Sequence, residues 1–166
     1  GASSTLIGLV GGISDSADSL FRIISGWFSD KIGKRKFLTA LGYSISTVAK
    51  PFMLLANSWG IVAGVRFGDR VGKGVRTASR DALIADSVDA KERGRGFGLH
   101  RAMDTSGAVI GLIIAAIIVY LIPGDKFHLE NKAYHWMVII GIIPAVLAVV
   151  VLMTLVQERK KLAASV

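Results

Sequence analysis

Five apolar segments alternate with short polar connections along the 166-residue chain. They cover approximately residues 4–28, 37–56, 58–84, 97–122 and 134–156. The last two segments are the plainest, because residues 105–124 and 136–156 contain no Asp, Glu, Lys or Arg. A helix needs about 20 apolar residues to cross the hydrocarbon layer of a bilayer. The pattern therefore predicts an all-α membrane protein of about five transmembrane helices, in a single helical domain over residues 1–166.

Composition agrees with this prediction, since 52% of the residues are hydrophobic and the mean hydropathy is +0.54. The net charge is +8, which in a soluble protein would favour a nucleic-acid partner. Here the basic residues lie at the ends of apolar segments or in one stripe, so the expected partner is the lipid bilayer and not nucleic acid. The chain has no cysteine, no H-E-x-x-H motif and scattered histidines, and we predict no catalytic residue, metal site or cofactor.

The connections alternate in charge. Residues 31–36 contain four basic side chains, and residues 91–95 and 159–161 contain three each. The opposite connections are poorer, because 57–58 has no basic residue and 123–133 has two that are offset by two acidic residues. Basic loops stay in the cytoplasm, so these basic connections and the C-terminus are predicted to be cytoplasmic. The N-terminus then lies outside, and the number of spans must be odd.

Charged residues form a stripe on the third segment. At 100° per residue its seven charges fall within about 140° of the helix circumference. They are Arg66, Asp69, Arg70, Lys73, Arg76, Arg80 and Asp81. A charge at the bilayer centre costs about 3 kcal/mol or more, so the stripe must face protein or a water-filled cavity. A cytoplasmic amphipathic helix is the alternative, but it would put the 31–36 and 159–161 clusters on opposite sides of the membrane.

Other segments supply charges at membrane depth. On the first segment Asp15, Asp18 and Arg22 share a face, and Arg101 and Asp104 begin the fourth. Together with Lys50 and the seven residues of the stripe, the charged residues predicted to lie at membrane depth are eight positive and five negative. Because buried charges are normally paired, either permanent salt bridges, carboxylates from elsewhere, or an anionic ligand must account for the surplus. The three aspartates named here are candidates for proton coupling, with permanent salt bridges as the alternative.

The connection between the first two segments carries a motif. Residues 26–36 read GWFSDKIGKRK, and this resembles the signature cytoplasmic loop of the major facilitator superfamily, G-x-x-x-D-[RK]-x-G-[RK]-[RK]. Residues 66–81 resemble the fourth helix of a bacterial subgroup, residues 93–101 its following loop, and Gly107 and Gly111 the close-packing glycines of the fifth helix. The five segments then correspond to helices two to six of the six-helix N-terminal half.

The resemblance has departures. Ser79 stands where proline is expected, Leu112 follows Gly111 where proline is also frequent, and Arg66 is followed by Arg70 instead of glycine four residues later. A first helix and a C-terminal half have no counterpart in the 166 residues.

The resemblance implies a fragment or split half of a secondary active transporter that moves a small solute, with an anionic solute as one reading, by alternating access across the bacterial cytoplasmic (inner) membrane. The remaining transporter helices or a second copy would supply the other wall. A non-transporting assembly or regulatory module is the alternative. The implied gating loop comprises Gly26, Asp30, Lys31, Gly33, Lys34 and Arg35. The implied cavity network comprises Asp15, Asp18, Arg22, Arg66, Asp69, Arg70, Lys73, Arg76, Arg80, Asp81, Arg101 and Asp104.

Overall fold

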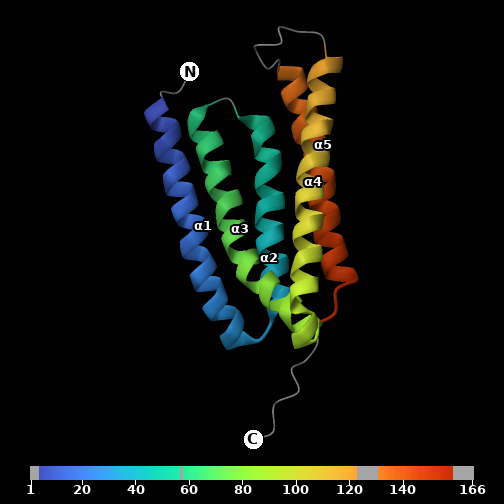
Figure 1. The fold of residues 1–166 in the computed structure, drawn as a ribbon. Helices are drawn as coiled ribbons and strands as arrows, with labels where there is room; N and C mark the ends of the chain where they lie inside the picture. Colours follow the sequence, from blue (N-terminus) through green and yellow to red (C-terminus); the bar gives the residue numbers. More distant parts are fainter. Residues whose placement is uncertain (1–3, 57, 123–130, 159–166) are drawn as a thin grey trace, which may run out of the picture.

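A computed structural model of the protein describes residues 4–56, 58–122 and 131–158. Its five α-helices run up and down beside one another, with no strand among the described residues (Figure 1). The elements are α1 (Ser4–Ile32), α2 (Arg35–Ala49), the 3-10 helix η1 (Lys50–Leu55), α3 (Trp59–Ser87), the 3-10 helix η2 (Ala90–Glu92), α4 (Arg93–Leu121) and α5 (Asn131–Thr154). The predicted all-α fold with five long helices is confirmed, whereas the exact membrane boundaries stay predictions.

Gly33 ends α1 and makes the tight connection to α2. Its φ angle of 69° lies in the left-handed region, which an L side chain rarely adopts. The Gly33 amide donates to the carbonyl of Ser29 at 3.0 Å, which satisfies one of the free carbonyls at the helix end. The chain thus reverses within two residues and α2 begins at Arg35.

The proline in the second segment ends α2. Pro51 has no amide hydrogen, and the chain tightens into η1 at this position. Helix α5 holds η1 in place, because the hydroxyl of Tyr134 on α5 donates to the carbonyl of Met53 at 3.2 Å. Lys50 is thereby positioned at the junction of the two helices.

Helix α3 lies between α1 and α2 and packs closely on both (Figure 1). A Cβ atom added at Gly72 would lie 2.7 Å from the carbonyl oxygen of Gly42 on α2. One added at Gly74 would lie 2.6 Å from the carbonyl oxygen of Asp18 on α1. Both crossings therefore depend on glycine, as is usual where helix backbones meet inside a membrane.

Small hydroxyl side chains strengthen the contact between α1 and α3. Ser25 lies 3.1 Å from Ser79, oxygen to oxygen, and also donates to the carbonyl of Val75. Ser79 is fully buried. The serine that replaces the expected proline therefore adds an interhelical hydrogen bond, and a proline at this position would lack the hydroxyl that makes it.

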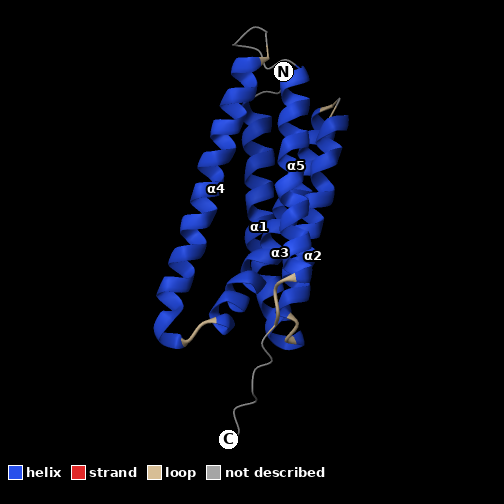
Figure 2. Ribbon diagram, turned by 90° about the vertical axis from the view of Figure 1, so that its right-hand side faces the viewer, coloured by secondary structure: helices blue, strands red, loops and turns tan. Residues whose placement is uncertain are grey.

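Helix α4 stands apart from α1 and α3 along most of its length (Figure 2). Its residues are almost all exposed, including large apolar ones such as Leu112 and Tyr120. Gly107 and Gly111, expected to pack closely, have no atom of the described residues within 4 Å of an added Cβ. An apolar helix with so little covered surface requires lipid or further helices around it.

Three helical stretches are long and apolar enough to cross a membrane, judged by length and composition among the described residues: Arg35–Leu55, Ala90–Leu121 and Lys132–Thr154. Helices α1 and α3 fall outside this group because they carry the charged residues at membrane depth. Each nevertheless has 29 residues, about 43 Å at 1.5 Å per residue, and runs alongside the others.

Candidate functional site: a charged groove

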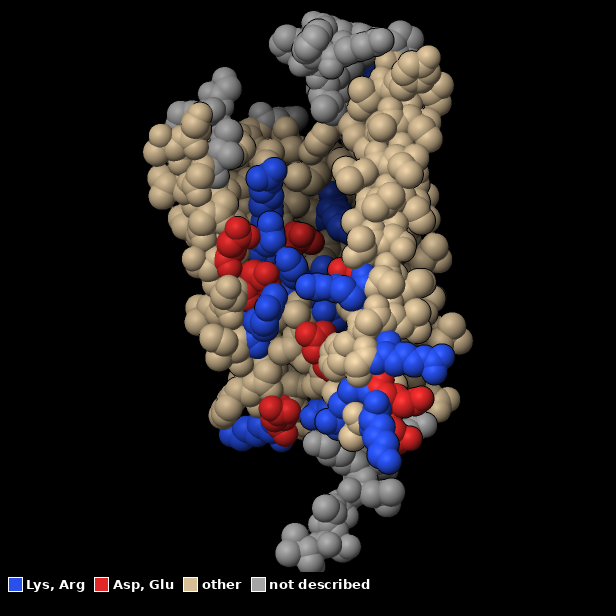
Figure 3. All heavy atoms as spheres, viewed as in Figure 1, with Lys and Arg blue, Asp and Glu red and all other residues tan. Residues whose placement is uncertain are grey.

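Charged side chains gather in a hollowed band between the α1 wall and the wall formed by α4 and α5 (Figure 3). We call this band the charged groove and define it by the stripe of α3 and the facing charges of α1. Because α3 is one continuous helix across the stripe, its seven charged residues keep the common face that the spacing predicted. The α1 members are Asp15, Asp18 and Arg22.

Ion pairs join α1 to α3 across the groove. Arg70 lies 3.3 Å from Asp15, and Lys73 lies 3.6 Å from Asp18. Arg22 also approaches Asp18, at 3.8 Å, from one turn further along α1. The two α1 carboxylates thus meet three cations, which leaves this part of the groove positively charged.

Asp18 is the most buried of these charges, with only 8% of its surface exposed. Its Oδ2 atom takes both ion pairs, whereas Oδ1 is buried and accepts no hydrogen bond from any residue that the structure describes. A buried acceptor without a donor is costly, so a further hydrogen-bond donor at Oδ1 of Asp18 would be stabilising.

Two further arginines of α3 have protein partners. Arg76 donates to the Oγ atom of Ser46 at 2.7 Å, and its guanidinium lies 4.7 Å from the ring centre of Tyr43 on α2. Arg80 pairs with its neighbour Asp81 at 2.9 Å. These contacts hold both guanidinium groups against the protein and partly withdraw their charge from the groove.

A pocket of about 390 Å³ lies where α1, the α2–η1 junction and α3 meet. It is lined by both signs of charge: Lys50, Arg66 and Arg70 with Asp15 and Asp69. Its volume is at the small end of the range for ligand pockets. We call it the outer pocket, because it is lined by residues of η1 and of the first half of α3, away from the basic connection at residues 31–36.

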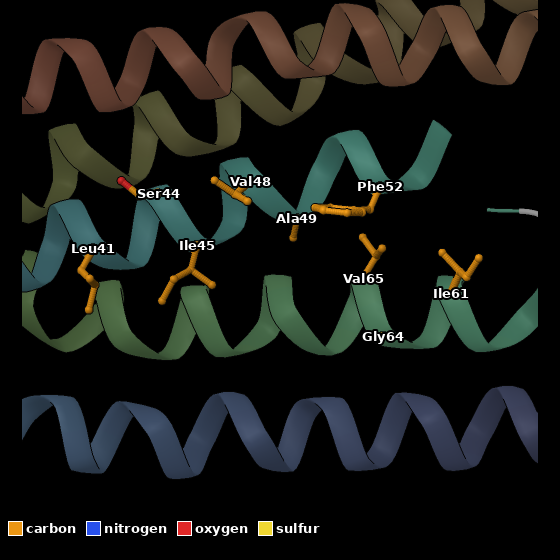
Figure 4. Close-up of a pocket in the computed structure, with 9 residues that line it drawn as sticks. All are labelled: Leu41, Ser44, Ile45, Val48, Ala49, Phe52, Ile61, Gly64 and Val65. Carbon is orange, nitrogen blue, oxygen red and sulfur yellow. The ribbon is translucent and has the colours of Figure 1, made fainter. Parts of the chain in front are cut away.

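A second pocket, of about 620 Å³, lies between α2 and α3 (Figure 4). Its walls are apolar side chains such as Leu41, Ile45 and Phe52, together with Ile61 and Val65 of α3. None of the described residues that line it is charged. The apolar lining of this second pocket favours a hydrocarbon ligand, whereas the charged lining of the outer pocket favours a polar solute.

The predicted gating loop forms a compact polar cluster at the other end of the bundle. Arg35 makes an ion pair with Asp86 of α3 and donates to the carbonyl of Ala82 at 3.0 Å. Asp30 lies 3.4 Å from the same guanidinium and is largely exposed. Arg35 is thus shared between an internal partner and an exposed carboxylate.

Other loop residues have separate roles. The Lys31 ammonium lies 4.8 Å from the ring centre of Trp27, and the exposed Lys34 directly precedes α2. A Cβ at Gly26 would make an ordinary 3.5 Å contact with Ala78. Past α5, the carboxylate of Glu158 accepts hydrogen bonds from the first amides of α2, where a negative charge stabilises a helix start.

Arg101 and Asp104 are not brought into this network. Both lie on the exposed face of α4, and neither forms an ion pair with any residue that the structure describes. Within the described ranges, no three His, Cys, Asp or Glu side chains gather as a metal site would require.

The structure adds residues that the spacing analysis did not assign to the site. Tyr43 and Ser46 hold Arg76, and Asp86 and Glu158 hold the loop. Lys50 lines the outer pocket and is a further residue of the site. A lysine inside an apolar segment, directly before a proline, is the signal that could have assigned it.

Apolar helices around a charged groove are typical of helical membrane transport proteins. The sequence profile of the Major Facilitator Superfamily matches residues 1–165. The chain belongs to this superfamily.

Similar proteins agree with this assignment. The chain is 42% identical over 124 residues to an uncharacterized MFS-type transporter of Methanocaldococcus jannaschii. This matched stretch covers 73% of the chain and 30% of the relative. The chain is 30% identical over 141 residues to the inner membrane transport protein YajR of Escherichia coli (84% and 29%), and 32% over 139 residues to the probable anion transporter 6, chloroplastic, of Arabidopsis thaliana (81% and 25%). The chain therefore matches less than a third of each relative. No solved structure matches the chain significantly.

Proposed function

We propose that the chain is part of a secondary active transporter in which the charged groove forms one wall of the solute path. The observation that carries this proposal is the concentration of charge on α1 and α3 inside an apolar bundle. Charges at membrane depth are costly unless they face protein or water, and such residues commonly mark solute pathways. In this family type, two helical halves rock around a central site.

The solute is small and anionic. Two α1 carboxylates meet three cations in the middle of the groove, and Arg66 and Lys50 add positive charge near them without an ion pair among the described residues. An anion would offset this surplus. The name of the Arabidopsis relative, a probable anion transporter, supports the same choice.

The second wall comes from further helices of the transporter or from a second copy. Helix α4 leaves its Arg101, Asp104 and glycine face uncovered by the described residues, which gives such a partner a surface to pack on. The loop cluster of Asp30 and Arg35 would latch that partner on the cytoplasmic side, because the side chain of Asp30 is 74% exposed and therefore accessible to another helix.

The cytoplasmic membrane is the proposed location, with the basic connections inside. The connections at residues 33–34 and 88–92 and the end of α5 lie at one end of the bundle, and residue 58 lies at the other (Figure 1). This arrangement fits the excess of basic residues in cytoplasmic loops.

Binding in lipid nanodiscs tests the anionic solute. Calorimetry would compare phosphate and sulfate with a neutral sugar, using the wild type, Arg70→Gln and Lys73→Gln. Each loss of a charge-assisted contact of about 1.5–3 kcal/mol should weaken anion binding roughly 10- to 100-fold. Arg95→Gln is the matched control, since its side chain is 88% exposed and lies outside the groove. Unchanged anion binding in both groove variants would contradict the proposal.

Uptake into proteoliposomes tests the need for a second wall. The chain alone should bind anions without transporting them, and transport should return when the remaining helices of the transporter are present. Uptake by single copies of the chain would refute the need for a partner. Binding without uptake in both preparations would favour the non-transporting module.

A further inference from the structure

The outer pocket carries an unusual set of charges for an anion site. Arg70 and Asp15 already pair with each other at 3.3 Å. The side chains of Lys50, Arg66 and Asp69 also line the pocket, and none of them forms an ion pair within the described part of the chain. Two cations and one carboxylate are therefore available to a ligand.

The charged residues of the outer pocket lie well inside the helical bundle and not at its end. Asp69 is the eleventh residue of α3, about 15 Å along the helix from its start at Trp59. Unpaired charges at that depth are expensive, and they are typically retained where a ligand or ion completes them.

The walls leave room for a ligand beside these charges. Gly11 contributes no side chain, and a Cβ there would have no atom within 4 Å. On the opposite wall, the turn at Pro51 places Lys50 at the pocket, and the bond from Tyr134 to the carbonyl of Met53 holds that turn. The backbone of Asp69 is fixed as well, because its carbonyl accepts from Ser46 at 3.2 Å.

We propose that the outer pocket binds a small zwitterion, a solute with one oxyanion group and one primary ammonium group. The oxyanion lies toward Lys50 and Arg66, and the ammonium lies toward Asp69. This inference rests on the proposed function and refines its solute: the oxyanion group that the groove attracts is accompanied by an ammonium group on the same molecule.

Electrostatics favours a zwitterion over the two simpler ligands. A plain anion would gain from the two free cations but would be repelled by the nearby carboxylates of Asp69 and Asp15. A plain amine would meet the reverse situation at Lys50 and Arg66. Only a ligand with both charges gives all three free side chains a group of opposite charge.

The same chemistry exists in two sources. A free amino acid carries a carboxylate and an ammonium group, and the headgroup of phosphatidylethanolamine carries a phosphate and an ammonium group. The two can be separated by the lipid used for reconstitution, so the experiment has one arm for each.

The test uses three ligands with the same three-carbon skeleton: β-alanine, propionate and propylamine. Their binding is measured by calorimetry on the chain in phosphatidylglycerol nanodiscs. We expect β-alanine to bind at least tenfold more tightly than either of the others. Asp69→Asn should remove the advantage of β-alanine over propionate, and Arg66→Gln should weaken both carboxylates at least tenfold. Asp89→Asn and Arg95→Gln, in the exposed connection before and at the start of α4, are the charge-matched controls.

The outcomes separate this inference from the proposed function. If propionate binds as tightly as β-alanine and Asp69→Asn changes nothing, the zwitterion is refuted, while loss of phosphate binding in Arg70→Gln and Lys73→Gln still supports an anionic solute. If none of the three ligands binds, the inference fails. A tenfold or larger loss of β-alanine affinity in phosphatidylethanolamine nanodiscs would assign the site to a lipid headgroup, and an unchanged affinity would assign it to a free solute. Circular dichroism and gel filtration verify that each variant is folded.

Discussion

The crossing of α2 and α3 offers a sharp test of how this bundle is held together. In Gly72→Ala the new Cβ would lie 2.6 Å from the Oγ atom of Ser46, 2.7 Å from the carbonyl oxygen of Gly42 and 2.9 Å from the amide nitrogen of Ser46. Two of these three are backbone atoms, which cannot rotate away as a flexible side chain can. The helices themselves must therefore move apart.

The size of the effect follows from the distances. Ordinary van der Waals contact begins at 3.4 Å, so a contact at 2.7 Å requires roughly 0.7 Å of separation. A gap of that size weakens the surrounding contacts along the whole crossing, and overpacking of this kind costs about 1–3 kcal/mol. For a chain of this length that corresponds to a fall of roughly 3–10 °C in melting temperature.

Gly64→Ala is the matched control on the same helix, two turns earlier. A Cβ at Gly64 has nothing within 4 Å, so the substitution meets no obstacle and removes a residue that is entropically costly in a helix. Its melting temperature should equal or slightly exceed that of the wild type. The assay is thermal unfolding in detergent micelles, followed by tryptophan fluorescence. Equal melting temperatures for Gly72→Ala and Gly64→Ala would show that the crossing is not as close as described.

Three further predictions follow from the contacts. Ser79→Val should lower the free energy of unfolding by about 1–3 kcal/mol, because the site is fully buried and has no room for a larger side chain. Ser79→Ala, which loses only the hydroxyl, should lower it by less than about 1 kcal/mol. Equal changes in melting temperature for the two variants would contradict the tight packing at this site. A double-mutant cycle on Arg35→Gln and Asp86→Asn should give a coupling free energy of about 0.5–3 kcal/mol in thermal unfolding, and additive effects would exclude a working ion pair. The chain has no cysteine, so single cysteines can report the orientation of the connections. Lys34→Cys should react with an impermeant maleimide only after the membrane is opened, whereas Ser58→Cys should react in intact cells. The reverse pattern would contradict the predicted orientation.

Much of the fold could be predicted from the sequence because its signals are local. Uncharged runs of about 20 residues predicted the last two helices, and the turn at Gly33 and the end of α2 before Pro51 depend on equally local chemistry. The stripe of α3 was equally accessible, since a period of 3.6 residues decides which side chains share a face.

The remaining features depend on partners that are distant in the sequence. Arg35 and Asp86 are separated by 51 positions, and no periodicity indicates that they meet. The same holds for Gly42 and Gly72, since many glycines in this chain could have formed the crossing. Helix α4 shows the limit most clearly: its pattern predicts a membrane helix with close-packing glycines, but not that it stands away from α1 and α3.

The two close contacts of α3 also fix how the helix is oriented about its own axis. Gly72 and Gly74 are two positions apart, which places them about 200° from each other around the helix, so α2 and α1 grip it from nearly opposite directions. Turning α3 by a single position would drive the branched side chain of Val71 or Val75 into a crossing that accepts only hydrogen. The arginines and lysine of this helix are therefore held at a constant angle about its axis, whereas Gly107 and Gly111 of α4 make no such close crossing with the described residues.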